Sequence, residues 1–175
     1  MLDAAGVEYQ AAKPEVDEDE LKLGLSDPVE IALRLAIAKA LGVPGDWVIG
    51  SDSVVSVDGR LFSKPVDREE AAEHLRFFSG KPMQLTSAVA LAHGQSLDWS
   101  HADTATLQVR PLSDGFIADY LEAEWPEVGY TVGVFRLEAR GVQLFDRIDG
   151  DHFTILGMPL IPLLGALRNR GLLSK

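Results

Sequence analysis

The hydrophobic positions of the chain fall into two patterns. Short apolar or alternating runs bounded by turn residues predict strands. These runs cover residues 47–55, 83–92, 101–112 and 142–148, and "FTIL" at 153–156 is expected to extend the same sheet.

Apolar residues at helical spacing, preceded by capping residues, predict helices. Asp27, Pro28 and Glu30 form a capping box before a helix that Gly42 ends. Further helices are expected at 67–80, 113–125 and 158–170. Helices alternate with strands, yet some strands meet without a helix between them. This order predicts an α/β fold, a mixed sheet with flanking helices.

Composition narrows the class of protein. The chain has 175 residues, 46% of them hydrophobic and 25% charged, which is typical of one globular domain spanning 1–175. The absence of cysteine excludes disulfides and thiolate chemistry. No apolar run reaches the roughly 20 residues of a membrane span, and the first residues lack a signal-peptide pattern. We therefore expect a cytoplasmic protein with no membrane partner.

Charge limits the partners further. The formal net charge is -11 at pH 7, and such a surface repels nucleic acid, whose binding requires Lys and Arg to neutralise phosphates. A small phosphate ligand is not excluded, because a few lysines in a cleft reverse the field locally.

An aspartate, Asp52, stands in the middle of the apolar segment "WVIGSDSVV". A buried carboxylate is unfavourable unless it is paired. Lys64 in "SKP" follows one hairpin later, and Lys39 shares a helix face with small and apolar residues, so either can approach Asp52. The alternative is a structural aspartate bonded to a loop. The acidic run "EVDEDE" at 15–20 offers further carboxylates or a solvated loop.

Carboxylates and two lysines suit phosphoryl chemistry. Carboxylates hold a divalent ion such as Mg²⁺, lysines neutralise phosphate oxygens, and a carboxylate can deprotonate the attacking water. A haloacid-dehalogenase-type phosphatase is disfavoured because the second acid of its motif is Val54 here. The sequence has no Gly-rich P-loop, no dinucleotide fingerprint and no metal-ligand spacing among its histidines.

The order of several segments resembles the Maf family of nucleoside triphosphate pyrophosphatases. These segments are "AIAKA", "VIGSDSVV", "FSKPVDREEAAEHLRFFSG", "LTSAVAL", "FRLEARGVQLFDRIDGD" and "ILGMPLIPLLGALRNRG". The resemblance covers essentially the whole chain. It implies an α/β fold with a deep cleft, related to inosine triphosphate pyrophosphatases. It also implies hydrolysis of a nucleoside triphosphate to the monophosphate and pyrophosphate with a divalent metal, Mg or Mn. A homodimer would fit the family.

The resemblance also implies roles for single residues. Asp52 matches the family's catalytic aspartate, a proton acceptor that we also expect to bind the metal. Lys39 and Lys64 match two family lysines expected to bind substrate phosphates. Glu18 falls near a family acid that takes part in metal or water handling.

Two further positions match those that contact the base. Ser53 follows the catalytic aspartate, and Glu138 stands in "LEARG". Glu138 resembles the branch acting on 7-methyl-GTP, whereas Ser53 matches neither that branch nor the pyrimidine branch. A carboxylate accepts hydrogen bonds from the donors of guanine and suits the positive charge of its methylated form. A rim carboxylate without a base contact is the alternative for Glu138.

The start of the chain departs from the family pattern. Family members open with a strand and a Ser-x-Ser-x-Arg-Arg loop before a helix that "MLDAAG" matches. We expect roughly 15–20 residues, the first strand and the phosphate-binding loop, to be absent. Either the start was assigned at an internal methionine or the protein is short. Because bidentate arginine contacts are hard to replace, a catalytically impaired nucleotide-binding relative is the alternative function.

Overall fold

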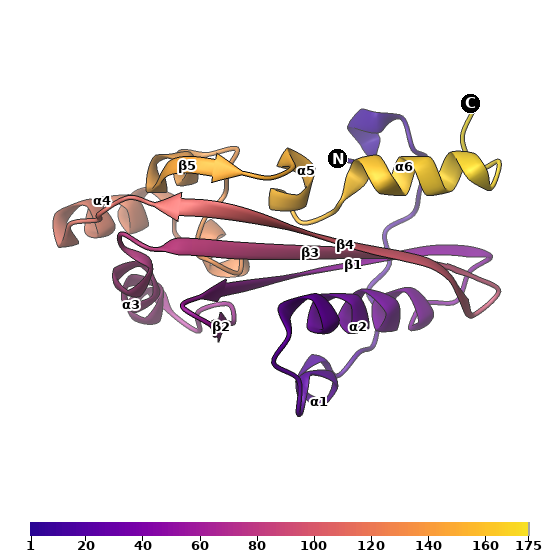
Figure 1. Cartoon of the computed structure of the whole chain (residues 1–175), viewed down its shortest axis with the longest axis horizontal. Helices are drawn as coiled ribbons and strands as arrows, with labels where there is room; N and C mark the ends of the chain where they lie inside the picture. The colour runs from indigo at the N-terminus through magenta and orange to yellow at the C-terminus, as the bar shows by residue number, and fades with distance from the viewer. Residues whose placement is uncertain (175) are drawn as a thin grey trace. The chain divides into compact units, whose positions relative to one another are not determined.

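The fold, seen in a computed structural model that describes residues 1–174, contains one five-stranded sheet (Figure 1). Its order is β2-β1-β3-β4-β5, with β1 (Trp47–Val57), β2 (Arg60–Phe62), β3 (Pro82–His93), β4 (Ser96–Val109) and β5 (Phe145–Asp149). The β1–β2 and β4–β5 pairs are antiparallel. Gly94 and Gln95, both at positive φ, form the tight turn between β3 and β4. The α/β class is confirmed, and the five strands form an antiparallel sheet with flanking helices.

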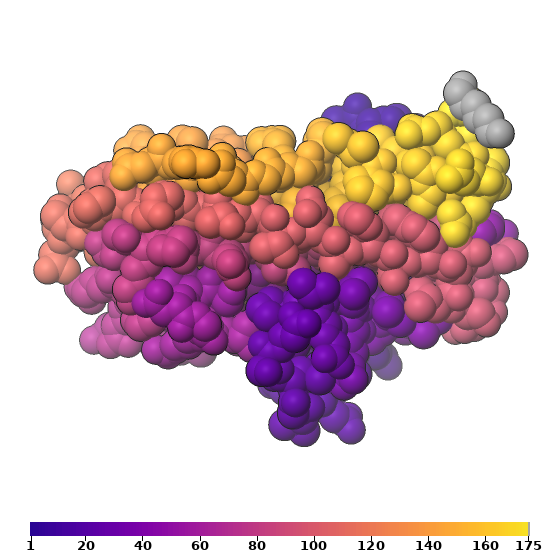
Figure 2. All heavy atoms as spheres, viewed as in Figure 1, coloured from indigo at the N-terminus to yellow at the C-terminus, as the bar shows by residue number. Residues whose placement is uncertain are grey.

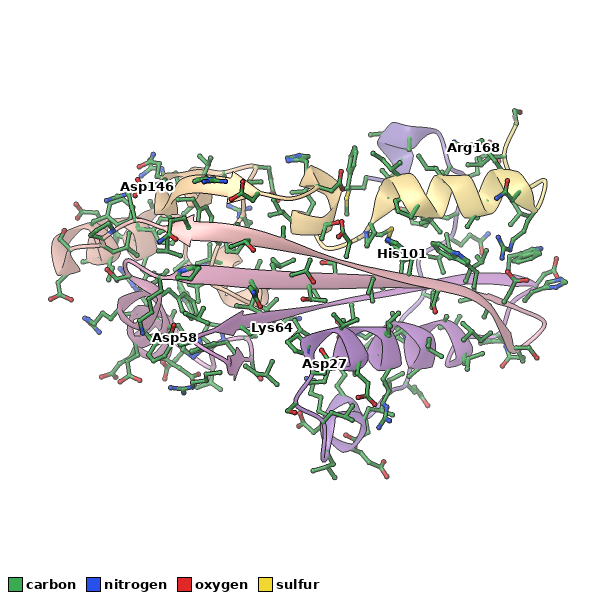
Figure 3. All side chains as sticks on the ribbon, viewed as in Figure 1. Asp27, Asp58, Lys64, His101, Asp146 and Arg168 are labelled. Atoms are coloured by element: carbon green, nitrogen blue, oxygen red, sulfur yellow. The ribbon has the colours of Figure 1, made fainter. Side chains whose placement is uncertain are left out.

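The helices begin and end close to the expected residues. They are α1 (Glu18–Lys22), α2 (Pro28–Leu41), α3 (Arg68–Phe78), α4 (Asp114–Glu124), α5 (His152–Ile155) and α6 (Leu160–Asn169), with 3₁₀ turns η1 (Asp3–Ala5), η2 (Glu127–Tyr130) and η3 (Arg140–Leu144). Asp27, labelled in Figure 3, caps α2 by accepting a hydrogen bond from Val29 N. Among the described residues, no helix has the length and apolar character that crossing a membrane requires.

The strand expected at "FTIL" is wrong, because these residues lie in α5 and the turn after it. Asp151 is the N-cap of α5, and its Oδ1 accepts hydrogen bonds from Phe153 N at 3.0 Å and Thr154 N at 3.1 Å. A side-chain acceptor at this position favours a helical turn. The capping contact therefore outweighs the β propensity of the apolar run.

The chain divides into two compact units, and β1, β3 and β4 each contribute residues to both. The first unit contains Met1–Ser53, Thr86–Thr104 and Asp151–Lys175, and the second contains Val54–Leu85 and Ala105–Gly150. Each unit has buried apolar residues from its own helices and strands.

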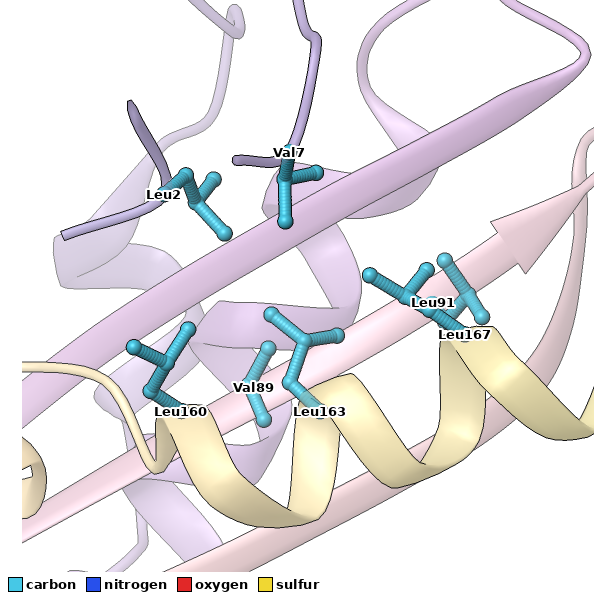
Figure 4. Close-up of a cluster of buried hydrophobic side chains, with 7 residues drawn as sticks. All are labelled: Leu2, Val7, Val89, Leu91, Leu160, Leu163 and Leu167. Carbon is cyan, nitrogen blue, oxygen red and sulfur yellow. The ribbon is translucent and has the colours of Figure 1, made fainter. Parts of the chain in front are cut away.

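In the first unit, α6 packs on β3 through one apolar stripe (Figure 4). Its buried residues, Leu160, Leu163 and Leu167, follow the spacing of a helix face. They form a cluster with Leu2, Val7, Val89 and Leu91. Helix α2 lies along the opposite face of the sheet in this unit (Figure 1). In this unit, α6 and α2 therefore lie on opposite faces of the sheet (Figure 1).

In the second unit, an aromatic group surrounds His74 of α3. The Phe62 ring contacts His74 edge-on at 5.0 Å between centroids and Phe78 at 4.7 Å. Burial lowers the pKa of His74 below its ordinary value, and nearby Arg60 acts in the same direction while Glu70 opposes it. His74 is therefore a packing residue of this core rather than a metal ligand.

Candidate active site

Helix α2 approaches β1 at a separation that only glycine permits. A Cβ atom at Gly50 would lie 2.2 Å from Ala36 O and 2.4 Å from Ala40 N. Residues two apart in a strand point to the same face, so Asp52 faces α2 as Gly50 does. The close packing therefore brings the last turn of α2, which carries Lys39, against Asp52.

Lys39 joins two carboxylates. Its Nζ lies 2.9 Å from Asp52 Oδ1 and 2.8 Å from Glu18 Oε1. Glu18 is the first residue of α1, a short helix that Asp17 caps. The segment that contains α1, in indigo at the bottom of Figure 2, lies at the surface. The side chains of Asp52 and Lys39 are 17% and 20% exposed and that of Glu18 is 43% exposed, so the trio is partly open to water.

The electrostatics of the trio keep the ammonium charged. Burial of Lys39 opposes its charged form, but the hydrogen bonds and charges of Glu18 and Asp52 outweigh burial and raise the pKa of Lys39 above its ordinary value. A charged ammonium between two carboxylates can move toward a phosphate oxygen when one arrives. The arrangement is therefore suited to an anionic ligand as well as to a cation.

The serines on each side of Asp52 face the opposite side of the sheet, because neighbouring side chains in a strand alternate. Ser51 Oγ lies 2.8 Å from Gly157 O, and Ser53 Oγ lies 3.3 Å from the same carbonyl oxygen. Ser53 also shares a 2.7 Å hydrogen bond with Ser87 Oγ. Through these hydroxyls, β1 hydrogen-bonds the segment after α5. Ser53 does not contact the Lys39 trio.

This hydrogen-bond network continues away from the strand. Ser87 Oγ donates to Thr154 O at 2.7 Å, and Thr154 Oγ1 donates to Asp103 Oδ2 at 3.0 Å. Neither these residues nor Gly50 were predicted from the sequence. The signal for Gly50 was a glycine inside a strand, which often marks a close approach of another backbone.

The other two predicted residues belong to the second unit. Lys64 is exposed in the segment between β2 and α3 (Figure 3). Glu138 is exposed in the turn that precedes η3. The structure thus brings together Glu18, Lys39 and Asp52, while phosphate binding by Lys64 and base contact by Glu138 stay predictions.

Glu18 and Asp52 are the carboxylates of the trio that could bind a divalent metal. Among the described residues, no group of three or more His, Cys, Asp and Glu side chains gathers to form a metal cage. Mg²⁺ does not need such a cage, because it usually binds one or two carboxylates together with water and substrate phosphates. Glu18 and Asp52, which face the same Lys39 nitrogen, fit this smaller set.

Comparison with known proteins adds to this geometry. The family model described as "Maf-like protein" matches residues 1–170. This chain belongs to the Maf family. A relative from Rhizobium meliloti (strain 1021), named 7-methyl-GTP pyrophosphatase, is 44% identical over 98% of this chain and 90% of its own length.

Two relatives carry the broader name nucleoside triphosphate pyrophosphatase. The one from Nitrobacter hamburgensis is 44% identical over 99% of this chain and 89% of its own length. The one from Sphingopyxis alaskensis is also 44% identical, over 98% of this chain and 91% of its own length. Similarity to Maf proteins thus extends over nearly the whole chain.

Proposed function

We propose that this Maf-family chain hydrolyses a nucleoside triphosphate to the monophosphate and pyrophosphate. The observation that carries the proposal is the contact of Lys39 with both Asp52 and Glu18 in the first unit. The names of the relatives support the same reaction. Because Glu138 resembles the branch that acts on methylated guanine, 7-methyl-GTP is the substrate to test first.

In the reaction, water attacks the α-phosphorus and the bond from that phosphorus to the bridging oxygen breaks. Asp52 orients the water and accepts its proton. Lys39 moves from its carboxylates to the phosphate oxygens and offsets the charge that develops on them. Pyrophosphate leaves, and the nucleoside monophosphate keeps the new oxygen.

A divalent cation, Mg²⁺ or Mn²⁺, would be held by Glu18 and Asp52. When bound, it would neutralise phosphate charge and lower the pKa of a coordinated water. Lys64 would add positive charge for the phosphates, a role that we propose from the family resemblance alone. Glu138 would contact the base, whereas the Ser53 hydroxyl faces the side of the strand opposite Asp52 and stays bonded to Ser87.

The substitution Asp52→Asn tests the proposal. Pyrophosphate release from 7-methyl-GTP should fall at least about 100-fold, because the proton acceptor is lost while the shape of the side chain stays. The matched control is Asp46→Asn, since Asp46 is exposed and pairs only with His93 among the described residues. Unchanged turnover in Asp52→Asn would contradict the assignment. Nucleotide binding without any release by the unaltered chain would favour the nucleotide-binding alternative.

Removal of divalent cations tests the metal separately. Chelation should stop pyrophosphate release, and adding back Mg²⁺ or Mn²⁺ should restore it. Glu18→Gln should raise the Mg²⁺ concentration needed for half-maximal rate, because one of two carboxylate ligands becomes a weaker neutral donor. A rate that chelation leaves unchanged would remove the metal from the proposal without removing Asp52.

We place the protein in the cytoplasm and without a nucleic-acid partner on the strength of its sequence and its net charge of -11. A homodimer is proposed from the family resemblance alone. Sedimentation of the purified chain would decide its oligomeric state.

A further inference from the structure

An ion pair with a buried member lies in the second unit. Glu124 ends α4, and its side chain is only 7% exposed. Arg136 donates from an Nη atom to Glu124 Oε2 at 3.0 Å. A buried carboxylate of this kind needs a charged partner, because burial without one is strongly unfavourable.

Arg136 also begins the turn that carries Glu138. Its carbonyl oxygen accepts a hydrogen bond from Ala139 N at 3.1 Å, which closes the turn around Leu137 and Glu138. A Cβ atom at Gly141 would lie 2.4 Å from that same oxygen, so the start of η3 packs directly on the Arg136 backbone. The position of Glu138 therefore depends on how Arg136 is held.

The backbone just before Arg136 is in an unfavourable conformation. Val134 has φ 58°, a left-handed value that β-branched residues rarely adopt. Tyr120 OH donates to Val134 O at 3.0 Å, and burial raises the pKa of Tyr120, so its hydroxyl stays a donor. Such a conformation persists only where surrounding contacts impose it. Tyr120 and Glu124, both on α4, thus hold the segment that leads to Glu138.

Three carboxylates, those of Glu124, Glu127 and Glu138, act on the guanidinium of Arg136, and Glu124 acts most strongly. The hydrogen bond to Glu124 is the main cause that raises the pKa of Arg136; burial opposes it, and the charges of Glu127 and Glu138 add to it. The hydrogen bond itself goes to Glu124. Glu138 is exposed, and within the part of the chain that the structure describes the guanidinium hydrogen-bonds Glu124 rather than Glu138. Its carboxylate is therefore available to a ligand.

We propose that Glu124 sets base selectivity by holding the guanidinium of Arg136 away from Glu138. Glu138 then keeps its full negative charge for a positively charged base such as 7-methylguanine. Glu124 is a positioning residue, since it acts through Arg136. This inference rests on the proposed function, in which Glu138 contacts the base.

The substitution Glu124→Gln tests the inference. The measured quantity is the ratio of kcat/KM for 7-methyl-GTP to kcat/KM for GTP, which does not depend on the folded fraction. The ratio should fall about 10-fold, because the released guanidinium turns to Glu138 and neutralises it. The double substitution E124Q/R136Q should restore the ratio, since no guanidinium is left to compete.

Two controls accompany this test. Glu122→Gln removes one charge from the same helix at a residue that is 78% exposed and pairs with Arg68, and it should leave the ratio unchanged. Glu138→Gln should lower the ratio, and adding Glu124→Gln to it should change nothing more. An unchanged ratio in Glu124→Gln, or a double substitution no better than the single one, would overturn the inference.

Failure of the proposed function would look different. In that case the unaltered chain would release no pyrophosphate from either nucleotide. Calorimetric titration with 7-methyl-GTP and GTP then measures the same selectivity as a ratio of dissociation constants. A preference for 7-methyl-GTP that Glu124→Gln removes and E124Q/R136Q restores supports the inference without catalysis. Equal binding of both nucleotides, or no binding, overturns it.

Discussion

The two units hold their charged residues in different ways. In the first unit, Lys39 lies between Glu18 and Asp52, and all three side chains reach water. In the second unit, Arg136 pairs with a Glu124 side chain that is almost fully buried. The contact distances are nearly equal, so the difference lies in access to solvent rather than in geometry.

This difference decides what each group can do. An ion pair open to water contributes little to stability, since water compensates for its loss, and its members can exchange partners with a ligand. A pair with a buried member is costly to break, because the remaining charge has no substitute for its partner. The Lys39 trio is thus suited to chemistry and the Glu124–Arg136 pair to support.

The largest expected effect comes from separating Lys39 and Asp52. Gly50→Ala places a methyl group against the backbone of α2, so α2 must move away from β1. Stability should fall by about 3 kcal/mol, and activity should be lost in the fraction that still folds. Urea unfolding and a pyrophosphate assay measure the two. The matched control is Gly165→Ala, since the nearest atom to its Cβ is a flexible Arg168 nitrogen at 4.0 Å. Equal effects of both substitutions would contradict this account of Gly50.

Replacing a glutamate by glutamine in each ion-pair group compares their contributions to stability and to turnover directly. Glu124→Gln should lower the free energy of unfolding by about 2 kcal/mol, the value of a hydrogen bond between charged groups. Glu18→Gln should lower it by less than about 1 kcal/mol, because Glu18 is exposed, yet should reduce turnover more. Denaturant curves and steady-state kinetics on both variants supply the numbers. The reverse order of the two stability losses would refute the division of roles.

The pH dependence of stability gives the smallest expected effect. Its direction differs between His74 in the second unit and Lys39 in the first. The pKa of His74 is lowered from 6.5, so its contribution to stability is present above that pH and falls as the pH drops below it. The pKa of Lys39 is raised from 10.5, so its contribution is present below that pH and is lost at higher pH. His74→Phe should remove about 1 kcal/mol or less of the acid sensitivity, and Lys39→Met part of the alkaline sensitivity. Chemical unfolding across pH measures both. An unchanged pH profile in each variant would show that other groups carry the dependence.

Much of the fold followed from local signals. The Asp27 cap and the Gly42 end of α2 were predictable because a side-chain acceptor and a glycine act within a few residues. The helix α5 (His152–Ile155) was not predicted, since its apolar residues resemble a strand and only the Asp151 cap distinguishes the two. The relative directions of β1, β3 and β5 depend on long-range pairing, which periodicity does not encode.

The site followed from the sequence only in part. The approach of Lys39 to Asp52 was expected from a lysine on an apolar helix face, and their contact at 2.9 Å is present. Glu18 was assigned to the site from its resemblance to a family acid in a loop. In the structure it begins the short helix α1, which Asp17 caps. The pairing of Glu124 with Arg136 was not expected, because nothing local marks a contact between a helix end and a later turn.

The hydrogen bonds of Ser51 and Ser53 to the Gly157 carbonyl join residues 106 and 104 positions apart. Glu18, Lys39 and Asp52 are synthesised early, whereas Gly157 leaves the ribosome roughly 5–20 s later at about 5–20 residues per second. Until then, the hydroxyls beside Asp52 have no carbonyl to bind. The charged side chains of the trio can therefore meet before the hydroxyls of their strand bind the Gly157 carbonyl.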